Sequence, residues 1–257
     1  MLEIMTNGWR GRIGLILPAD NVLIEPELYA LELSGVSFHT LRMTTTDHEA
    51  MRRQGVELAK SITELGLDAV VYACAETSFN GGSGVRETLS ELIAEECGLP
   101  VVTATNAMLA ALEAMTVRRI AVLTPYKEES GQAFESTMRE AGLVVVSAVH
   151  RDFSRESTDA REWFITNRQP ASTAYSMARA LESADADAIV IASTNLATLA
   201  MIAQLERDAN KPVVSTNQSI LWWCLQTLGI AADGLDLGSL MDLPLGTPKL
   251  PAMEALR

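Results

Sequence analysis

The chain has few cysteines, histidines and aromatic residues for its length. Its 257 residues include three cysteines and three histidines, and phenylalanine, tryptophan and tyrosine together make up 5%. Cys74, Cys97 and Cys224 are far apart and form no C-x-x-C motif, which argues against a disulfide framework or a zinc site. The G-x-S-x-G elbow of serine hydrolases is also absent.

Positive charge and long hydrophobic runs are scarce as well. The chain has 20 Lys and Arg against 33 Asp and Glu, a net charge of −13, so we expect no nucleic-acid-binding surface. No apolar run approaches the roughly 18 residues of a membrane helix. The opening MLEIMTNGWRGR lacks the features of a signal peptide. We therefore expect a cytoplasmic protein that does not enter a membrane. A homo-oligomer is compatible with the sequence, which does not indicate the oligomeric state.

An internal duplication is the strongest pattern in the chain. The segment Asp68–Phe79, DAVVYACAETSF, is repeated 119 residues later as Asp187–Thr198, DAIVIASTNLAT. Two further pairs of segments follow the same order: RIGLILP with RIAVLTP, and LPVVTATNAMLAAL with KPVVSTNQSILWWCL. The period is far longer than the roughly 20–50 residues of a solenoid repeat. Two similar lobes are the better interpretation.

Apolar, β-branched runs alternate with helical patterns along each half. Such alternation is typical of parallel sheets in a doubly wound α/β arrangement. We predict a first lobe of residues 1–115 plus 218–257 and a second of residues 116–217. The two lobes would be related by a pseudo-two-fold axis, with the active site in the cleft between them. The irregular tail is expected to pack on the first lobe, and the polar segment Arg151–Arg168 to form a surface loop with some helix.

The repeat places Cys74 opposite Ser193, each just after a predicted buried strand. Ligands bind at the carboxyl ends of strands in such sheets. Two opposed groups suit chemistry at a carbon next to a carboxylate, where a proton or a covalent bond changes face. We expect nearby donors to lower the pKa of the Cys74 thiol, so that its thiolate is accessible near neutral pH. Ser193 is chemically weaker, because a serine needs a base beside it.

Three further positions belong to the predicted site or its surroundings. Asn21 and Tyr126 lie in equivalent loops of the two halves and can donate hydrogen bonds to a carboxylate. Glu76 is either a general base beside the thiol or a solvated carboxylate, and the second is favoured because a buried anion opposes an anionic substrate. The glycines of Gly81–Gly84 lack the spacing of a phosphate-binding loop, so we assign them to a tight turn, with Ser83 capping the next helix.

At these residues the chain resembles the aspartate/glutamate racemase superfamily, particularly its maleate cis-trans isomerase and arylmalonate decarboxylase branch. The motifs are LILPADNVLIEPEL, YACAETSFNGG, LTPY, IASTNLAT and KPVVSTNQSILWW. The resemblance implies an enzyme without a cofactor or metal that acts on a small carboxylic or dicarboxylic acid. It also implies that Cys74 adds to the substrate double bond and that position 193 serves as acid. Asn21 and Tyr126 would hold the carboxylates, helped by backbone donors that follow the two thiol positions: Ala75, Glu76, Thr194 and Asn195.

Two departures from the branch leave the reaction open. Ser193 replaces the second cysteine, and Ala75-Glu76 replaces a Thr-Ser pair that offers hydroxyl donors to a substrate carboxylate. The substrate is therefore expected to differ from the family's at that end, with a cationic or neutral group there as one hypothesis. We interpret the chain first as an isomerase that uses Cys74. A decarboxylase with a single thiol as proton donor and a non-catalytic binder of small acids are the alternatives.

Overall fold

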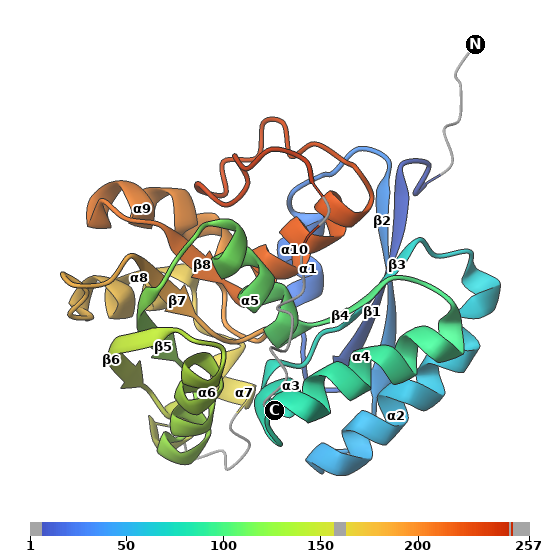
Figure 1. Cartoon of the computed structure of the whole chain (residues 1–257), viewed down its shortest axis with the longest axis horizontal. Helices are drawn as coiled ribbons and strands as arrows, with labels where there is room; N and C mark the ends of the chain where they lie inside the picture. Colours follow the sequence, from blue (N-terminus) through green and yellow to red (C-terminus); the bar gives the residue numbers. More distant parts are fainter. Residues whose placement is uncertain (1–6, 157–162, 247, 249–257) are drawn as a thin grey trace.

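The strands form two similar parallel sheets. The computed structural model describes residues 7–156, 163–246 and 248, and within these ranges each sheet has four strands (Figure 1). The first contains β1 (Gly11–Pro18), β2 (Val36–Met43), β3 (Ala69–Tyr72) and β4 (Val101–Thr103). The second contains β5 (Arg119–Thr124), β6 (Val144–His150), β7 (Ala188–Ile191) and β8 (Val213–Ser215). Their orders, β2-β1-β3-β4 and β6-β5-β7-β8, are equivalent, which confirms the predicted α/β fold with two similar lobes.

Helices follow most strands and cover the sheets (Figure 1). The first half of the chain contributes α1 (Ile24–Tyr29), α2 (His48–Ser61), α3 (Ala75–Phe79), α4 (Ser83–Cys97) and α5 (Ala104–Ala114). The second contributes α6 (Glu128–Glu140), α7 (Trp163–Thr166), α8 (Ala171–Ala180), α9 (Ile202–Ala209) and α10 (Thr216–Thr227). Short 3₁₀ turns occur at Thr63–Leu65, Phe153–Glu156 and Leu199–Met201. Asp47 caps α2, accepting a hydrogen bond from the amide of Ala50.

The duplication extends to individual hydrogen bonds. The carboxylate of Asp68 accepts a hydrogen bond from the Arg12 amide, and that of Asp187 accepts one from the Arg119 amide, each at 2.8 Å. Strands β3 and β7 span residues that are equivalent at the predicted offset. The Asp-Ala pair that opens each repeat therefore ties the third strand of a lobe to its first strand.

Helices α5 and α10 join the two lobes. They pack against each other in the centre of the molecule, where Figure 1 shows α5 in green beside α10 in red-orange. Helix α5 also contacts β8 of the second sheet, and α10 contacts β3 of the first. Residues Thr216–Leu225 of α10 are all buried. Because α10 touches both sheets, the assignment of residues 218–257 to the first lobe stays a prediction.

Two local predictions near Cys74 were wrong. The residues after Cys74 form the short helix α3 instead of an open loop, since Cys74 itself has extended backbone angles and the helix starts at Ala75. Ser83 does not cap α4; it is the first helical residue, and Gly82 occupies the N-cap position with φ of 83°. Gly81 and Gly82 both have positive φ, which supports the tight-turn interpretation of this cluster.

The described part of the tail makes contacts beyond the first lobe. Ser239 donates hydrogen bonds to Glu206 of α9 through its amide and hydroxyl, and the Gln218 side chain of α10 donates to the Leu237 carbonyl. The described part of the tail thus packs on α9 and α10, with α9 belonging to the second lobe, and not on the first lobe alone. Residues 247 and 249–257 lie outside the described part of the chain.

Segment 151–168 is less exposed than its polarity suggests. Phe153 is fully buried, and the guanidinium of Arg151 stacks over its ring at 4.6 Å. The middle of the segment, residues 157–162, is outside the described ranges. After β7 the first helical residues are those of the 3₁₀ turn Leu199–Met201, so residues 196–198 lie in the loop that follows the strand.

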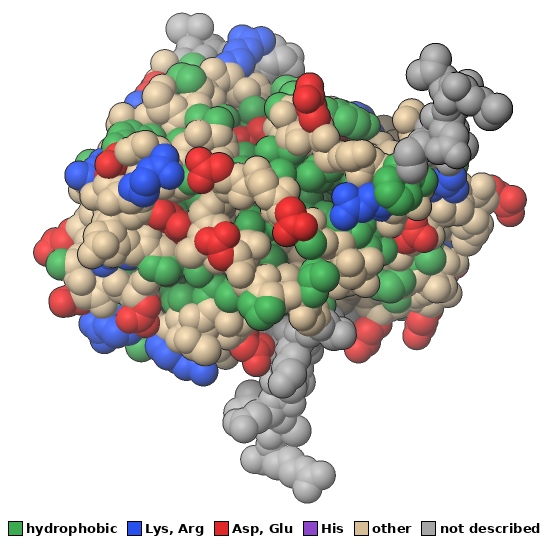
Figure 2. All heavy atoms as spheres, turned by 90° about the horizontal axis from the view of Figure 1, so that it is seen from above, with side chains coloured by type: hydrophobic (Ala, Val, Ile, Leu, Met, Phe, Trp, Pro, Cys, Tyr) green, Lys and Arg blue, Asp and Glu red, His purple; other side chains and the backbone are tan. Residues whose placement is uncertain are grey.

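The surface in Figure 2 mixes acidic, basic and apolar side chains. On this face the Lys and Arg side chains lie in separate groups and not in one continuous basic area. None of the described helices is both long enough and apolar enough to cross a membrane. The cytoplasmic location and the absence of nucleic-acid binding stay predictions.

Candidate active site

One cavity lies between the lobes and is lined by residues from both. Its walls come from the segments that follow β1, β2 and β3 on one side and β5 and β7 on the other. Each sheet order changes direction between its first and third strands, and open α/β sheets bind ligands at such switch points. The cavity is small, with a volume of about 70 Å³. All eight predicted site residues line it: Asn21, Cys74, Ala75, Glu76, Tyr126, Ser193, Thr194 and Asn195.

Cys74 lies at the carboxyl end of the first sheet and is 7% exposed. Burial raises the pKa of its thiol to about 11. Hydrogen bonds from the side chain and backbone of Thr77 act in the opposite direction, while the carboxylates of Glu76 and Asp20 add to the increase. The expectation of a lowered pKa is therefore wrong. Desolvation outweighs the donors, and the thiol is protonated at neutral pH.

Thr77 connects Cys74 to a buried tyrosine. Its hydroxyl lies 2.8 Å from that of Tyr72, and both side chains are inaccessible to solvent. Burial raises the pKa of Tyr72 strongly, so its hydroxyl stays neutral. This small network fixes the Thr77 side chain beside the thiol. The sequence analysis did not identify Thr77; its position three residues after Cys74 becomes meaningful only because α3 is a helix.

Two carboxylates flank the thiol. Glu76 accepts a hydrogen bond from the Ser130 hydroxyl of α6, so it is held by the second lobe and does not simply point into solvent. Asp20, which the sequence analysis did not select, lines the same cavity from the loop after β1. Burial raises the pKa of Asp20, and the charge of Arg42 counteracts this. The strand-end rule that selected Asn21 also applies to Asp20.

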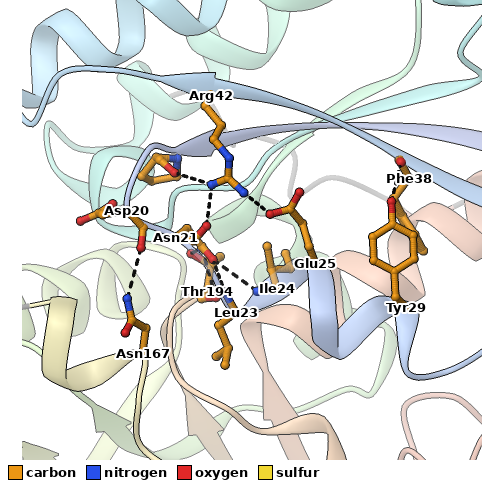
Figure 3. Close-up of polar contacts among 11 residues, drawn as sticks. Asp20, Asn21, Leu23, Ile24, Glu25, Tyr29, Phe38, Arg42, Asn167 and Thr194 are labelled. Carbon is orange, nitrogen blue, oxygen red and sulfur yellow. Dashed lines mark hydrogen bonds and ion pairs between the residues drawn. The ribbon is translucent and has the colours of Figure 1, made fainter.

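Asn21 links the two lobes. Its side-chain amide donates to the carbonyl and the hydroxyl of Thr194, at 3.2 and 3.0 Å. Its side-chain oxygen accepts from the amides of Leu23 and Ile24 at the start of α1. Figure 3 shows these contacts, with the guanidinium of Arg42 holding the same loop through the Asn21 carbonyl. The amide expected to hold a substrate carboxylate is thus engaged with Thr194.

The loop after β7 turns back on itself. The Ser193 hydroxyl accepts a hydrogen bond from the Asn195 amide at 2.9 Å, and the Ser193 amide donates to the Thr216 hydroxyl at 3.0 Å. Ser193 is 2% exposed and Asn195 is 6% exposed. The side-chain oxygen Oδ1 of Asn195 is buried and has no hydrogen-bond partner among the described residues. Thus the second lobe presents a serine and an unsatisfied amide oxygen at its switch point.

Glu27 of α1 fixes this loop from the first lobe. One carboxylate oxygen accepts from the amides of Thr198 and Leu199, at 2.6 and 2.8 Å, and the other accepts from the Asn217 side chain at 2.8 Å. Burial raises the pKa of Glu27, and these three donors counteract it. Glu27 therefore ties α1 to the loop that bears Ser193. Residues separated by about 170 positions meet here, which no local sequence pattern indicates.

Tyr126 packs into the cavity wall from the second lobe. It is buried, and its ring centroid lies 5.6 Å from that of Phe79 in α3. Other lining residues that sequence analysis did not select come from the segment after β2 and from α2: Thr45, Thr46, His48 and Met51. The structure therefore brings the predicted residues together, while their chemical roles stay predictions.

Comparison with known proteins is consistent with this geometry. The family model described as arylmalonate decarboxylase matches residues 13–241. This chain belongs to the arylmalonate decarboxylase family. It is 26% identical over 215 residues to the arylmalonate decarboxylase of Bordetella bronchiseptica, covering 83% of this chain and 86% of that protein. It is also 26% identical over 235 residues to a maleate isomerase of Nocardia farcinica, covering 85% and 90% of the two chains.

Solved structures share the same fold. A cysteine-to-serine variant of the Nocardia farcinica maleate cis-trans isomerase, with a covalently bound succinylcysteine intermediate, superposes with a TM-score of 0.80. It has 22% sequence identity, and the match covers 90% of this chain and 98% of that one. Together these findings confirm the resemblance to the branch that contains maleate isomerases and arylmalonate decarboxylases.

Proposed function

We propose that this chain is a cofactor-independent isomerase, similar to maleate cis-trans isomerase, that acts on a small unsaturated carboxylic acid. The main supporting observation is the position of Cys74 at a switch point, where it lines the same cavity as Ser193 of the other lobe. Among the described residues, Cys74 is the one thiol in that cavity wall. The similar Nocardia farcinica enzyme is described with a succinylcysteine intermediate, a covalent product of a cysteine and a four-carbon acid.

The proposed reaction begins with addition of the Cys74 sulfur to one carbon of the substrate double bond. A carbon–sulfur bond forms, the π bond breaks, and the electron pair moves onto the neighbouring carbon and its carboxylate. Rotation about the resulting single bond then changes the geometry. Expulsion of the sulfur re-forms the double bond in the other configuration, so the thiol is regenerated and no atoms are gained or lost.

The thiol proton must leave before or during addition. We assign the uptake of this proton to Glu76 or Asp20, because the charges of both carboxylates act on the Cys74 thiol. Transfer to a carboxylate is uphill, so we expect the bound substrate to stabilise the thiolate. Ser193 accepts a hydrogen bond from its own loop, and we assign it a positioning role in place of an acid.

Decarboxylation is the second candidate, and the protonated thiol favours it. A malonate-type acid would lose carbon dioxide by breaking a carbon–carbon bond, leaving the electron pair in an enediolate. The Cys74 thiol would then donate its proton to that carbon. A thiol with a pKa of about 11 is ready as a donor at neutral pH, and the second lobe offers serine instead of a second thiol.

The experiment that tests the proposal compares wild type with Cys74→Ala on unsaturated and malonate-type acids, followed by proton NMR. Interconversion of cis and trans acids by wild type alone supports the isomerase. Release of carbon dioxide from a malonate by wild type alone supports the decarboxylase. Turnover that survives in Cys74→Ala contradicts both. Circular dichroism verifies that the variant is folded.

A further inference from the structure

Two carboxylates line the cavity wall, and of these only Asp20 is under the influence of a nearby positive charge, that of Arg42. Asp20 and Glu76 line it from two different segments of the first lobe, whereas no Lys or Arg does so in the part of the chain that the structure describes. A dicarboxylate would bring two further negative charges into this site. Because like charges at a few ångströms repel strongly in a partly desolvated cavity, this arrangement disfavours a second substrate carboxylate.

The nearest guanidinium groups are already engaged. Arg42 forms an ion pair with Glu25 and donates to the carbonyls of Pro18 and Asn21. Figure 3 shows its side chain extending towards Glu25 and the loop backbone. Arg52 donates to the carbonyls of Thr77 and Asn80. Both arginines therefore stabilise the backbone around the cavity and do not line it.

One predicted donor in the wall is already engaged, and one buried acceptor there has no partner. The Asn21 amide, a donor expected for a carboxylate, is engaged with Thr194. Asn195 lines the cavity, and its buried Oδ1 atom has no partner in the described structure. A buried acceptor without a donor is uncommon, and it indicates a ligand that supplies an N–H or O–H group.

We propose that the substrate is a small monocarboxylic acid whose other end carries an ammonium group, in place of the second carboxylate of maleate. This inference rests on the proposed function and specifies its substrate class. The ammonium would pair with Glu76 and Asp20, and it would supply the N–H donor that the Asn195 oxygen lacks. One carboxylate is retained, because it takes up the charge that develops when sulfur adds to the double bond.

The ammonium also resolves the difficulty of the protonated thiol. A positive charge near Cys74 favours its thiolate, opposing the effect of burial and of the two carboxylates. Binding of the substrate would then activate the nucleophile, whose pKa the protein alone raises. A dicarboxylate would have the reverse effect.

Binding of three unreactive four-carbon acids tests this inference without requiring turnover. Succinate carries two carboxylates, succinamate has one carboxylate and a neutral amide, and 4-aminobutanoate has one carboxylate and an ammonium. We expect isothermal titration calorimetry on the unmodified chain to show 4-aminobutanoate binding about tenfold or more tightly than succinate, with succinamate between them. Glu76→Gln and Asp20→Asn should each reduce that ratio by about threefold or more.

Glu129→Gln is the matched control. It removes one negative charge from the first turn of α6, close in sequence to the Ser130 that contacts Glu76, but Glu129 is exposed and does not line the cavity. This variant should keep the wild-type ratio. Adding salt should weaken the preference in wild type, because part of it is electrostatic.

Three outcomes would overturn the inference: succinate binding as tightly as 4-aminobutanoate, a ratio unaffected by both carboxylate variants, or no binding of any of the three acids. The result is separable from the proposed function. If Cys74→Ala abolishes turnover while the wild type prefers succinate, the isomerase proposal stands and only the substrate class is wrong. If Cys74→Ala keeps turnover, the binding ratio can still be measured.

Discussion

Replacing Glu76 with glutamine should make Cys74 more acidic. The Glu76 charge contributes to the increase in the Cys74 pKa, which is about 11 against a reference of 9.0. This difference corresponds to roughly 3 kcal/mol in favour of the protonated form, and to about a hundredfold less thiolate at neutral pH. Burial is the largest cause, so removing one carboxylate recovers only part of this difference. We expect about three- to tenfold more thiolate in Glu76→Gln, or roughly 1 kcal/mol.

The assay is the pH dependence of iodoacetamide alkylation, with each cysteine peptide quantified by mass spectrometry. Fitting the rate against pH gives the apparent pKa of Cys74 independently of how accessible the sulfur is. Thr77→Val is the opposite control: it removes a hydrogen bond that lowers the Cys74 pKa, so its titration should move to higher pH. Cys97 and Cys224 serve as internal references in the same digest.

The reasoning is refuted if wild-type Cys74 titrates near 9, or if Glu76→Gln leaves the apparent pKa unchanged. The first result would mean that burial does not control the thiol. The second would mean that Glu76 is too well screened to influence it, and the electrostatic argument for the substrate class would lose one of its two carboxylates.

Three further predictions concern stability. Glu27→Ala leaves the amides of Thr198 and Leu199 and the Asn217 side chain without their acceptor. It should lower the free energy of unfolding in urea by roughly 2–4 kcal/mol and raise KM. An unchanged unfolding midpoint would rule out the bridging role. Gly131→Ala brings a Cβ within 2.2 Å of the buried His150 ring and should lower the free energy of unfolding by roughly 1–3 kcal/mol. Gly142→Ala is the control, because its Cβ meets no neighbour and only the backbone strain of a φ of 83° remains. The pKa of the Cys74 thiol is higher in the folded than in the unfolded state, so its contribution to stability is complete below the unfolded pKa near 9 and is lost as pH rises through about 11. Thermal stability should therefore fall over that interval, and it should fall less steeply in Cys74→Ser. Equal slopes in the two proteins would contradict this.

Much of the architecture was predictable because the duplicated segments are recognisable from short runs of sequence. The two Asp-Ala strands align at the offset read from the sequence, since each Asp binds the equivalent Arg amide in its own lobe. Buried parallel strands have continuous apolar runs, which are visible without a structure. Ligands bind at the carboxyl ends of parallel strands, and the candidate residues chosen on this basis line one cavity.

What the sequence did not predict depends on contacts between distant segments. The pairing of Asn21 with Thr194, the Glu27 bridge and the tail's contact with α9 join residues that no periodicity relates. The direction of the Cys74 pKa shift was also wrong, because it depends on the balance between desolvation and donors, and that balance is set by three-dimensional packing. Asp20 was missed although it lies beside Asn21 in the same loop at the end of β1.

The central claim is that Cys74 forms a covalent bond with a small unsaturated acid. It is tested most directly by incubating wild type and Cys74→Ala with maleate and with (Z)-4-aminobut-2-enoate, quenching in acid, and mapping adducts by peptide mass spectrometry. We predict that the mass of the Cys74 peptide of wild type increases by the mass of one substrate molecule, because addition of S–H across the double bond loses no atoms. The modified fraction of this peptide should be larger with (Z)-4-aminobut-2-enoate than with maleate. Turnover without any adduct on Cys74, or an adduct on another residue that persists in Cys74→Ala, would contradict the account.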